Sequence, residues 1–291
     1  MTLQQFVLRC ASQQDAESAV NALDDGFPEA FSSISYVRAD GDVWHINAIG
    51  EGQLPDLDAV ETCVRRHVTD IRVEGVPDRD WITHTLSNLA PVDAGTFVVH
   101  GSHDRPFSNI NHVGILIDAG LAFGTGHHET TRGCLQLLSD VVKKREVLSA
   151  CDIGSGTGVL AIAYALKTRC PVLATDIDPI AVDVARENAT KNNAAPLLRF
   201  AIANGTQHLA IAERAPYDLI FANILAQPLR RMAHDIRRVS SRRTGLILSG
   251  LLKEQEAGVL SAYRQVGFYL KQKRHLGDWS SLYLVRSHRY S

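Results

Sequence analysis

The 291-residue sequence lacks the features of membrane, secreted and zinc-stabilised proteins. No stretch approaches the roughly 18 consecutive apolar residues of a membrane-spanning helix. The first residues, MTLQQFVLRCASQQD, have neither a basic flank nor a sustained apolar core, so we expect no secretory signal. The five cysteines are scattered and never spaced as CxxC. Disulfides and a zinc ribbon are therefore not expected, and a cytoplasmic location fits this cysteine usage best.

Lysine is missing from the first 75 residues. That segment has five arginines and thirteen acidic residues, a net charge of −8, whereas the remaining 216 residues have 25 basic and 19 acidic side chains, a net charge of +6. An acidic surface repels a phosphate backbone and attracts a basic partner. It also improves solubility on its own. The asymmetry therefore bears on function only if other features of the sequence require a partner.

The front third of the chain predicts a small α+β domain over residues 1–76. Strand and helix patterns follow one another as β-α-β-β-α-β, at 5–10, 14–23, 31–38, 43–48, 57–68 and 71–76. This order is typical of a ferredoxin-like domain, in which two helices pack on one antiparallel sheet. The segment RDWITHTLSNL predicts a linker helix within residues 77–91.

From residue 92 to the end, the sequence predicts a doubly wound α/β domain. Beyond its opening stretch, strand patterns at 147–151, 172–175, 197–202, 219–222 and 245–248 alternate with helical patterns at 159–166, 180–188, 229–239 and 254–266. Two strand-like runs, 268–272 and 281–285, close the chain. The alternation predicts a parallel sheet, here of seven strands, with ligands at the carboxyl ends of its strands. The closing pair is expected to add an antiparallel strand at the sheet edge.

The sharpest chemical signal is the segment CDIGSGTGVLAIA, Cys151–Ala163. A buried strand runs into Asp152, and the chain then turns sharply at Gly154, Gly156 and Gly158 and begins a helix. Glycine is needed at these positions because a Cβ would block close approach of a ligand to the backbone. The spacing is GxGxG, with Val159 where a pyrophosphate-binding loop has its third glycine. This departure disfavours a nicotinamide dinucleotide and favours a nucleoside without phosphates, of which S-adenosyl-L-methionine is the obvious example.

Two polar residues end later strands. Asp176 lies 22 positions beyond Gly154, where a carboxylate can accept hydrogen bonds from both ribose hydroxyls of an adenosine. Asp178 and Pro179 predict a helix start, with Asp178 as the N-cap. Asn223 ends the fourth strand of the domain, on the ligand-binding side of the sheet. It is either a site residue or the cap of the helix that follows.

With these residues in view, the chain resembles the ribosomal protein L-eleven methyltransferase family, bacterial enzymes that methylate amino groups on that basic ribosomal protein. The resemblance covers nearly the whole chain. Its motifs are GTGHHETT (Gly124–Thr131), DIGSGTG (Asp152–Gly158), DIDP (Asp176–Pro179), NIL (Asn223–Leu225), SGLL (Ser249–Leu252), the closing Asp278-Trp279 and Trp81 in the segment RDWITHTLSNL. It implies a Rossmann-like class I methyltransferase domain over 92–291, with the domain over 1–76 recognising the substrate.

The resemblance also implies the site. The GTGHHETT segment would form a lid over the methionine end of the cofactor, with Thr125 and Gly126 contacting it and His128 holding the loop. The expected cofactor-binding residues are Thr125, Gly126, Asp152, Gly154, Gly156, Asp176 and Asn223. No metal is expected, because the adjacent side chains of His127, His128 and Glu129 cannot converge on one ion and no Cys or His cluster elsewhere supplies further ligands.

Methyl transfer to an amine requires in-line positioning of the two reactants more than covalent help from the protein. A lysine amine, with an unperturbed pKa of about 10.4, must first lose its proton. Desolvation and a neighbouring sulfonium both lower that pKa. We therefore expect no dedicated base, and Asn223, His128 and Trp279 are the candidate residues for positioning the amine.

The expected partner is a basic ribosomal protein docked on the acidic N-terminal domain. Neither a membrane nor direct nucleic-acid binding is expected, and the chain is expected to be a monomer. The sequence leaves other functions open. A run of arginines (Arg230, Arg231, Arg237, Arg238, Arg242 and Arg243, the first four on one face of a predicted helix) would suit an RNA methyltransferase. A protein-lysine methyltransferase with another target, a non-catalytic module that binds S-adenosylmethionine, and a nicotinamide dehydrogenase are the further alternatives.

Overall fold

The computed structural model describes residues 4–27, 30–31, 33–38, 43–50, 54–75, 91–102, 112–117 and 128–286. The chain divides into two compact units, Met1–Asp78 and Arg79–Ser291. The predicted linker helix lies outside the described residues except for residue 91. Within the described ranges, no helix combines the length and the apolar character needed to cross a bilayer.

The first unit contains the six elements predicted for it, in the predicted order. They are β1 (Gln4–Cys10), α1 (Gln13–Gly26), β2 (Ser33–Arg38), β3 (Trp44–Gly50), α2 (Leu57–Val64) and β4 (Asp70–Gly75). The strands form an antiparallel sheet in the order β2-β3-β1-β4. Alternate residues of β1 (Phe6, Leu8 and Cys10) are buried in a core shared with both helices. The period of two in the sequence thus marks the face of the sheet that the helices cover.

The second unit is built on a seven-stranded sheet, which confirms the predicted fold class. Its strands are β8 (Ala150–Ile153), β9 (Val172–Asp176), β10 (Leu198–Ile202), β11 (Tyr217–Asn223), β12 (Ser240–Leu252), β13 (Phe268–Leu276) and β14 (Trp279–Arg286). They are ordered β10-β9-β8-β11-β12-β14-β13. Neighbouring strands from β10 to β12 are parallel, and β14 is antiparallel to both β12 and β13. The antiparallel strand is therefore inserted beside β12, and β13 forms the edge.

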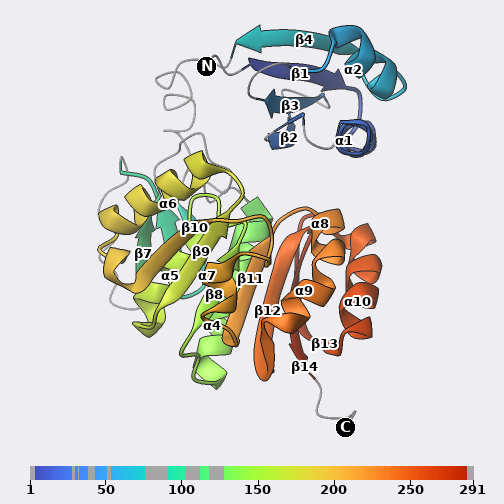
Figure 1. Ribbon diagram of the computed structural model, residues 1–291. Helices are drawn as coiled ribbons and strands as arrows, with labels where there is room; N and C mark the ends of the chain where they lie inside the picture. Colours follow the sequence, from blue (N-terminus) through green and yellow to red (C-terminus); the bar gives the residue numbers. More distant parts are fainter. Residues whose placement is uncertain are drawn as a thin grey trace. The chain divides into compact units, whose positions relative to one another are not determined.

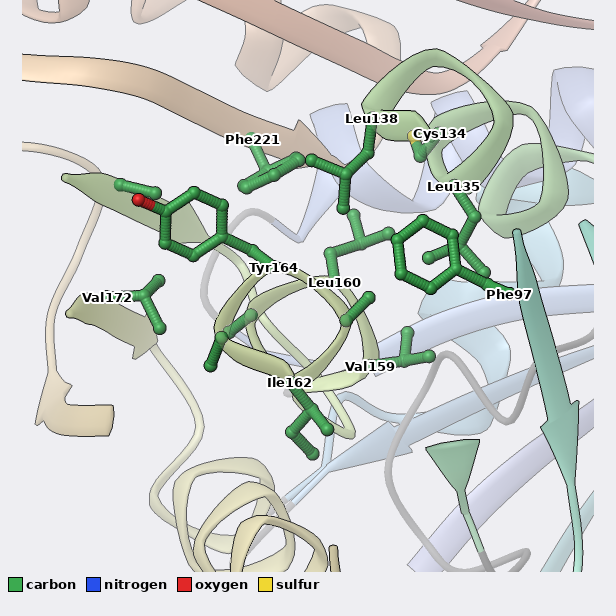
Figure 2. Close-up of a cluster of buried hydrophobic side chains, with 14 of the residues drawn as sticks. Phe97, Cys134, Leu135, Leu138, Val159, Leu160, Ile162, Tyr164, Val172 and Phe221 are labelled. Atoms are coloured by element: carbon green, nitrogen blue, oxygen red, sulfur yellow. The ribbon is translucent and has the colours of Figure 1, made fainter. Parts of the chain in front are cut away.

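Helices cover both faces of this sheet (Figure 1). One face packs against α4 (His128–Lys144), α5 (Val159–Thr168) and α6 (Pro179–Lys191), and the other against α7 (Leu209–Ala212), α8 (Ala226–Arg231), α9 (Ala233–Arg238) and α10 (Glu256–Gln265). The short 3-10 helices are η1 (Ala195–Leu197) and η2 (Lys253–Gln255). Figure 2 shows the core around α5, where Tyr164 lies edge-on to Phe221 of β11 with ring centroids 6.3 Å apart.

Two regions differ from the sequence prediction. The helix predicted over 229–239 is two short helices, α8 and α9, separated at Met232. Leu229, Ala233 and Ile236 stay buried in the same core across this break, which explains why their spacing resembles that of one helix. The sequence patterns predicted no element over 92–146. In the structure, β5 (Val92–Ala94), β6 (Phe97–His100) and β7 (Val113–Leu116) form a small sheet in this region, and α4 follows.

Gly154 and Gly250 leave room for Ile224, the residue after β11. A Cβ on Gly154 would overlap Cγ2 of Ile224, and one on Gly250 would lie 2.7 Å from its carbonyl carbon and 2.9 Å from its amide nitrogen. Both glycines have a positive φ, 68° and 82°. Gly250 lies where the register of β12 against β14 shifts. The segments DIGSGTG, NIL and SGLL therefore meet at one point of the fold.

We predict that Gly250→Ala destabilises the second unit by at least about 3 kcal/mol, because a strained φ of about 1–2 kcal/mol is added to a clash with backbone that cannot move away. Gly267→Ala is the matched control: its φ is 88°, and a Cβ there would meet nothing within 4 Å. The control should lose about 1 kcal/mol. Denaturant unfolding of the two variants measures the difference, and equal losses would show that the Ile224 contact contributes nothing.

Candidate functional site

The carboxyl ends of β9, β8 and β11 lie side by side. Ile153 at the end of β8 pairs with Thr175 of β9 on one side and with Ala222 of β11 on the other. The residues that follow, Asp176, Gly154 and Asn223, are therefore brought to adjacent positions from three separate parts of the chain. The strand order reverses between β8 and β11, which is where doubly wound sheets bind ligands.

The glycine loop is held by Asp176. The backbone N–H of Gly156 donates to Oδ2 of Asp176 at 2.8 Å, and the N–H of Asp178 donates to Oδ1 at 3.1 Å. Burial raises the pKa of Asp176 above its ordinary value, against the lowering effect of these two hydrogen bonds. A carboxylate has about four acceptor positions, so each oxygen can still accept another hydrogen bond. Asp178 caps α6 as predicted, accepting from the N–H of Ile180 at 2.8 Å.

Asp152 lies beneath the loop and is 1% exposed. Its Oδ2 accepts a hydrogen bond from the N–H of Ala161 in the first turn of α5 at 3.1 Å. Its Oδ1 is buried and has no hydrogen-bond partner among the described residues. Burial raises the pKa of Asp152 to about 7, helped by the negative charge of Asp176 and opposed by the Ala161 hydrogen bond. In this structure Asp152 supports the turn into α5.

Asn223 ends β11 with an unsatisfied acceptor. Its Nδ2 donates to Oγ1 of Thr131 at 3.5 Å, while its buried Oδ1 has no hydrogen-bond partner within the described part of the chain. Oγ of Ser155, in the glycine loop, is also buried without such a partner. A buried polar atom left unpaired costs about 1–3 kcal/mol. Two such atoms at the carboxyl ends of these strands mark this end of the sheet as a place where a polar ligand would complete the hydrogen bonding.

The start of α4 is anchored at the same edge. Oγ of Ser281 in β14 donates to the carbonyl oxygen of Thr130 at 3.4 Å and lies 2.7 Å from Oγ of Ser249 in β12. Gly133 packs so closely against Ser281 that a Cβ would overlap the serine. Thr131, Ser249 and Ser281 are thus site-edge residues that the sequence analysis did not identify. Ser249 was visible within the SGLL motif, but neither its burial nor its partner could be read from the sequence.

Trp279 stands at the same edge, but not next to Asn223. It opens β14 opposite Leu252 of β12, and β12 separates it from β11. Two strand spacings of about 4.8 Å therefore lie between the strands of Trp279 and Asn223. Of the other predicted residues, Thr125, Gly126 and His127 lie outside the described residues, and for His128 the structure describes its place as the first residue of α4.

An ion cluster around the largely buried Glu256 fixes the strand that carries Trp279. The carboxylate of Glu256, in α10, accepts hydrogen bonds from Nζ of Lys273 at 2.7 Å and from Oγ of Ser280 at 3.0 Å, and lies 2.7 Å from Nε2 of His275. Burial alone would raise the pKa of Glu256, but these three partners together lower it. No pattern in the sequence indicates this cluster, because its members come from three elements. Among the described residues, no group of His, Cys, Asp and Glu could hold a metal ion.

Comparison with known proteins places these features in a family. Residues 42–287 match the family model described as ribosomal protein L11 methyltransferase. The chain is 42% identical over 281 residues to a ribosomal protein L11 methyltransferase of Brucella abortus (strain S19), covering 94% of this chain and 97% of that protein. It is 41% identical over 277 residues to one of Rhodopseudomonas palustris (strain BisB5), covering 94% of each.

One solved structure is similar in fold. The crystal structure of a ribosomal protein L11 methylase from Lactobacillus delbrueckii subsp. bulgaricus superposes with a TM-score of 0.61 and 25% sequence identity. The matched region covers 69% of this chain and all of that one.

We predict that Asp152 makes stability fall as pH rises from about 4 to 7, because a carboxyl whose pKa rises on folding binds a proton more tightly in the folded state. Asp152→Asn removes this slope, worth up to about 4 kcal/mol for a shift of about three units. The measurement is the free energy of unfolding between pH 4.5 and 8, with the surface variant Asp183→Asn as control. Parallel profiles for the wild type and Asp152→Asn would contradict the assignment.

Proposed function

The chain belongs to the ribosomal protein L11 methyltransferase family, with S-adenosylmethionine as its cofactor, and on that premise we propose that it methylates lysine or N-terminal amines of ribosomal protein L11. When bound, S-adenosylmethionine supplies an electrophilic methyl group. The observation that carries the proposal is the buried Oδ1 of Asn223, which has no hydrogen-bond partner among the described residues and lies at the same strand ends as the loop that Asp176 holds.

The residues at the three strand ends fit this cofactor. The carboxylate of Asp176 keeps two acceptor positions after binding the loop and Asp178, which suits a pair of ribose hydroxyls. Ile177 and Ile202, at the ends of β9 and β10, are 60% and 54% exposed, so apolar surface stands beside Asp176 for an adenine ring. Following the family motif, we assign Thr125 and Gly126 to the methionine end and include Gly154, Gly156 and Asn223 in the site. Asp152 supports the site from below.

Asn223 is the residue we assign to the amine. Its Oδ1 can accept an N–H from an incoming amino group, which leaves the nitrogen lone pair free to attack the methyl group of the cofactor. A hydrogen-bond acceptor holds both the neutral and the charged amine and removes no proton, so its role is to position. We also assign His128 and Trp279 to positioning the amine, with Trp279 held in place through Ser280 and Glu256.

The proposal is tested by incubating the purified protein with methyl-labelled S-adenosylmethionine and purified ribosomal protein L11, and mapping labelled sites by mass spectrometry. Asn223→Ala should lower the rate at saturating cofactor by about 100-fold or more, since it removes a contact to the reacting group. Asp176→Ala should weaken cofactor binding at least 10-fold, whereas the surface control Asp183→Ala should not. Cofactor binding without any transfer would favour a non-catalytic binding module, and label in RNA would favour an RNA methyltransferase.

We also propose that the first unit docks the basic substrate through its acidic surface, with residues 1–76 as the recognition domain, 77–91 as a linker and 92–291 as the catalytic domain. Asp56 and Asp58 are exposed at the start of α2, and the carboxylate of Asp56 makes no capping hydrogen bond. Their charges are therefore available to a partner. The free thiols of all five cysteines and the ribosomal target fit a cytoplasmic monomer.

We expect Asp56→Lys/Asp58→Lys to weaken binding of ribosomal protein L11 by about 10-fold at low ionic strength, with a smaller effect as salt screens the surface. Cofactor affinity should not change, since these residues belong to the other unit. Glu187→Lys/Glu213→Lys makes the same change of charge on exposed residues of the second unit and is the control. Calorimetric titration with each ligand decides: equal loss of substrate affinity in both variants would show that net charge, not the first unit, attracts the substrate.

A further inference from the structure

A basic surface lies at the opposite end of the strands of the seven-stranded sheet, around the start of β12. We call it the arginine edge, and it consists of Arg145, Arg237, Arg238, Arg242, Arg243 and Arg286. About six residues of β12 separate Arg243 from Ser249, the partner of Asn223, which corresponds to about 20 Å of strand. The arginine edge is therefore remote from the site of methyl transfer.

Contacts among the described residues hold these arginines together. Arg286, at the end of β14, donates to the carbonyl oxygen of Ser240 at 3.5 Å. Arg145, following α4, donates to the carbonyl oxygen of Arg243 and, at 2.5 Å, to that of Asp218. Burial lowers the pKa of Arg286, and the positive charges of Arg237 and Arg242 lower it further, so the three guanidinium groups lie near one another.

The positive charge of this surface is poorly compensated. Arg238 forms an ion pair with Asp235 at 3.2 Å, but the side chains of Arg237, Arg242 and Arg243 have no hydrogen bond or ion pair within the described part of the chain. Lys143 and Lys144 are exposed at the end of α4, next to Arg145. Against these eight cations, the same segments carry Glu146, Asp218 and Asp235. Grouped like charges destabilise a fold unless an anion lies between them.

We propose that the arginine edge binds the phosphate backbone of RNA. Guanidinium groups bind phosphates through two parallel hydrogen bonds, and this surface is made mainly of arginine. Arg242 and Arg286 extend from neighbouring strands about 4.8 Å apart, so the surface presents closely spaced cations, which suit a chain of phosphates rather than a single anion. A basic ribosomal protein would be repelled here. The choice of RNA over other polyanions rests on the proposed function, whose target is a ribosomal protein.

This RNA is not the methyl acceptor, because the arginine edge and Asn223 lie at opposite ends of the strands. Of the arginines that suggested an RNA methyltransferase, Arg230 and Arg231 are in α8, which follows Asn223, whereas the other four belong to the arginine edge. The surface would instead hold the enzyme near RNA that accompanies its protein substrate.

The test is fluorescence anisotropy with a labelled single-stranded RNA of 20 nucleotides and the full chain. The variant Arg237→Gln/Arg242→Gln/Arg243→Gln removes three charges without breaking any described side-chain hydrogen bond. The control Arg199→Gln/Lys253→Gln/Lys271→Gln removes three charges from exposed residues elsewhere in the same unit. We expect the first variant to lose at least 10-fold in affinity at 50 mM salt and the control less than threefold. The slope of log affinity against log salt should shrink by about 2, at about 0.7 per phosphate contact.

Equal losses in both variants, or no RNA binding by the wild type, would overturn the proposal. So would arginine-dependent binding to vesicles of phosphatidylserine and phosphatidylcholine with none to RNA. Methyl transfer to purified ribosomal protein L11 without RNA is measured in parallel and should differ less than twofold between the wild type and the arginine variant. If transfer is absent from the wild type while RNA binding still depends on the arginine edge, the proposed function fails and the RNA surface stands.

Discussion

The packing of Ile224 between Gly154 and Gly250 is the constraint on which the catalytic unit depends. It brings the cofactor loop, the end of β11 and the bulge of β12 within van der Waals distance, so none of the three can move alone. Neither glycine tolerates a side chain, because each has a positive φ and faces Ile224 directly. The position of Asn223 follows from this packing, since it immediately precedes Ile224. Precision at the reacting end of the site is therefore set by apolar packing and glycine backbone rather than by polar contacts.

A network of hydrogen bonds connects this packed region to the neighbouring elements. From the carbonyl oxygen of Thr130, hydrogen bonds run through Ser281 to Ser249, and Ser249 also donates to the carbonyl oxygen of Ser280 at 3.0 Å. The hydroxyl of Ser280 continues the network to Glu256. These groups are buried, so an unpaired member would be costly and the network has few alternative arrangements. It links α4, whose first four residues are the end of the predicted lid segment, to the strand that opens with Trp279.

The sequence predicted the parts of this structure whose signal is local. Residues close in the sequence were enough to predict the glycine turn at 154, 156 and 158, the strand-end Asp176 and the helix cap at Asp178. In the structure, the strand ends that carry these residues lie next to one another. The sequence could not show that β14, and not β13, lies beside β12, because the two strands of a hairpin have the same residue pattern whichever of them is the inner strand. The break at Met232 could not be predicted, because buried residues continue on both sides of it at the spacing of one helix. The Glu256 cluster could not be predicted from the sequence, because its partners are far apart in the chain and share no spacing pattern. They are required because a buried carboxylate must be paired and hydrogen-bonded.

The charge asymmetry of the chain has a chemical consequence at the site. A basic substrate would be drawn to the first unit, yet on the proposed function its amine reacts on a unit, residues 79–291, that has 25 basic and 18 acidic side chains and a net charge of +7. Positive surroundings favour the neutral amine, and so does burial, because each disfavours an additional cation. Of the carboxylates at the described strand ends, Asp152 has a pKa of about 7 and Asp176 is engaged by the loop, so neither stabilises an ammonium ion strongly. On the proposed function, these electrostatics would lower the proton affinity of an incoming amine, and an asparagine that positions the nitrogen would then suffice without a dedicated base.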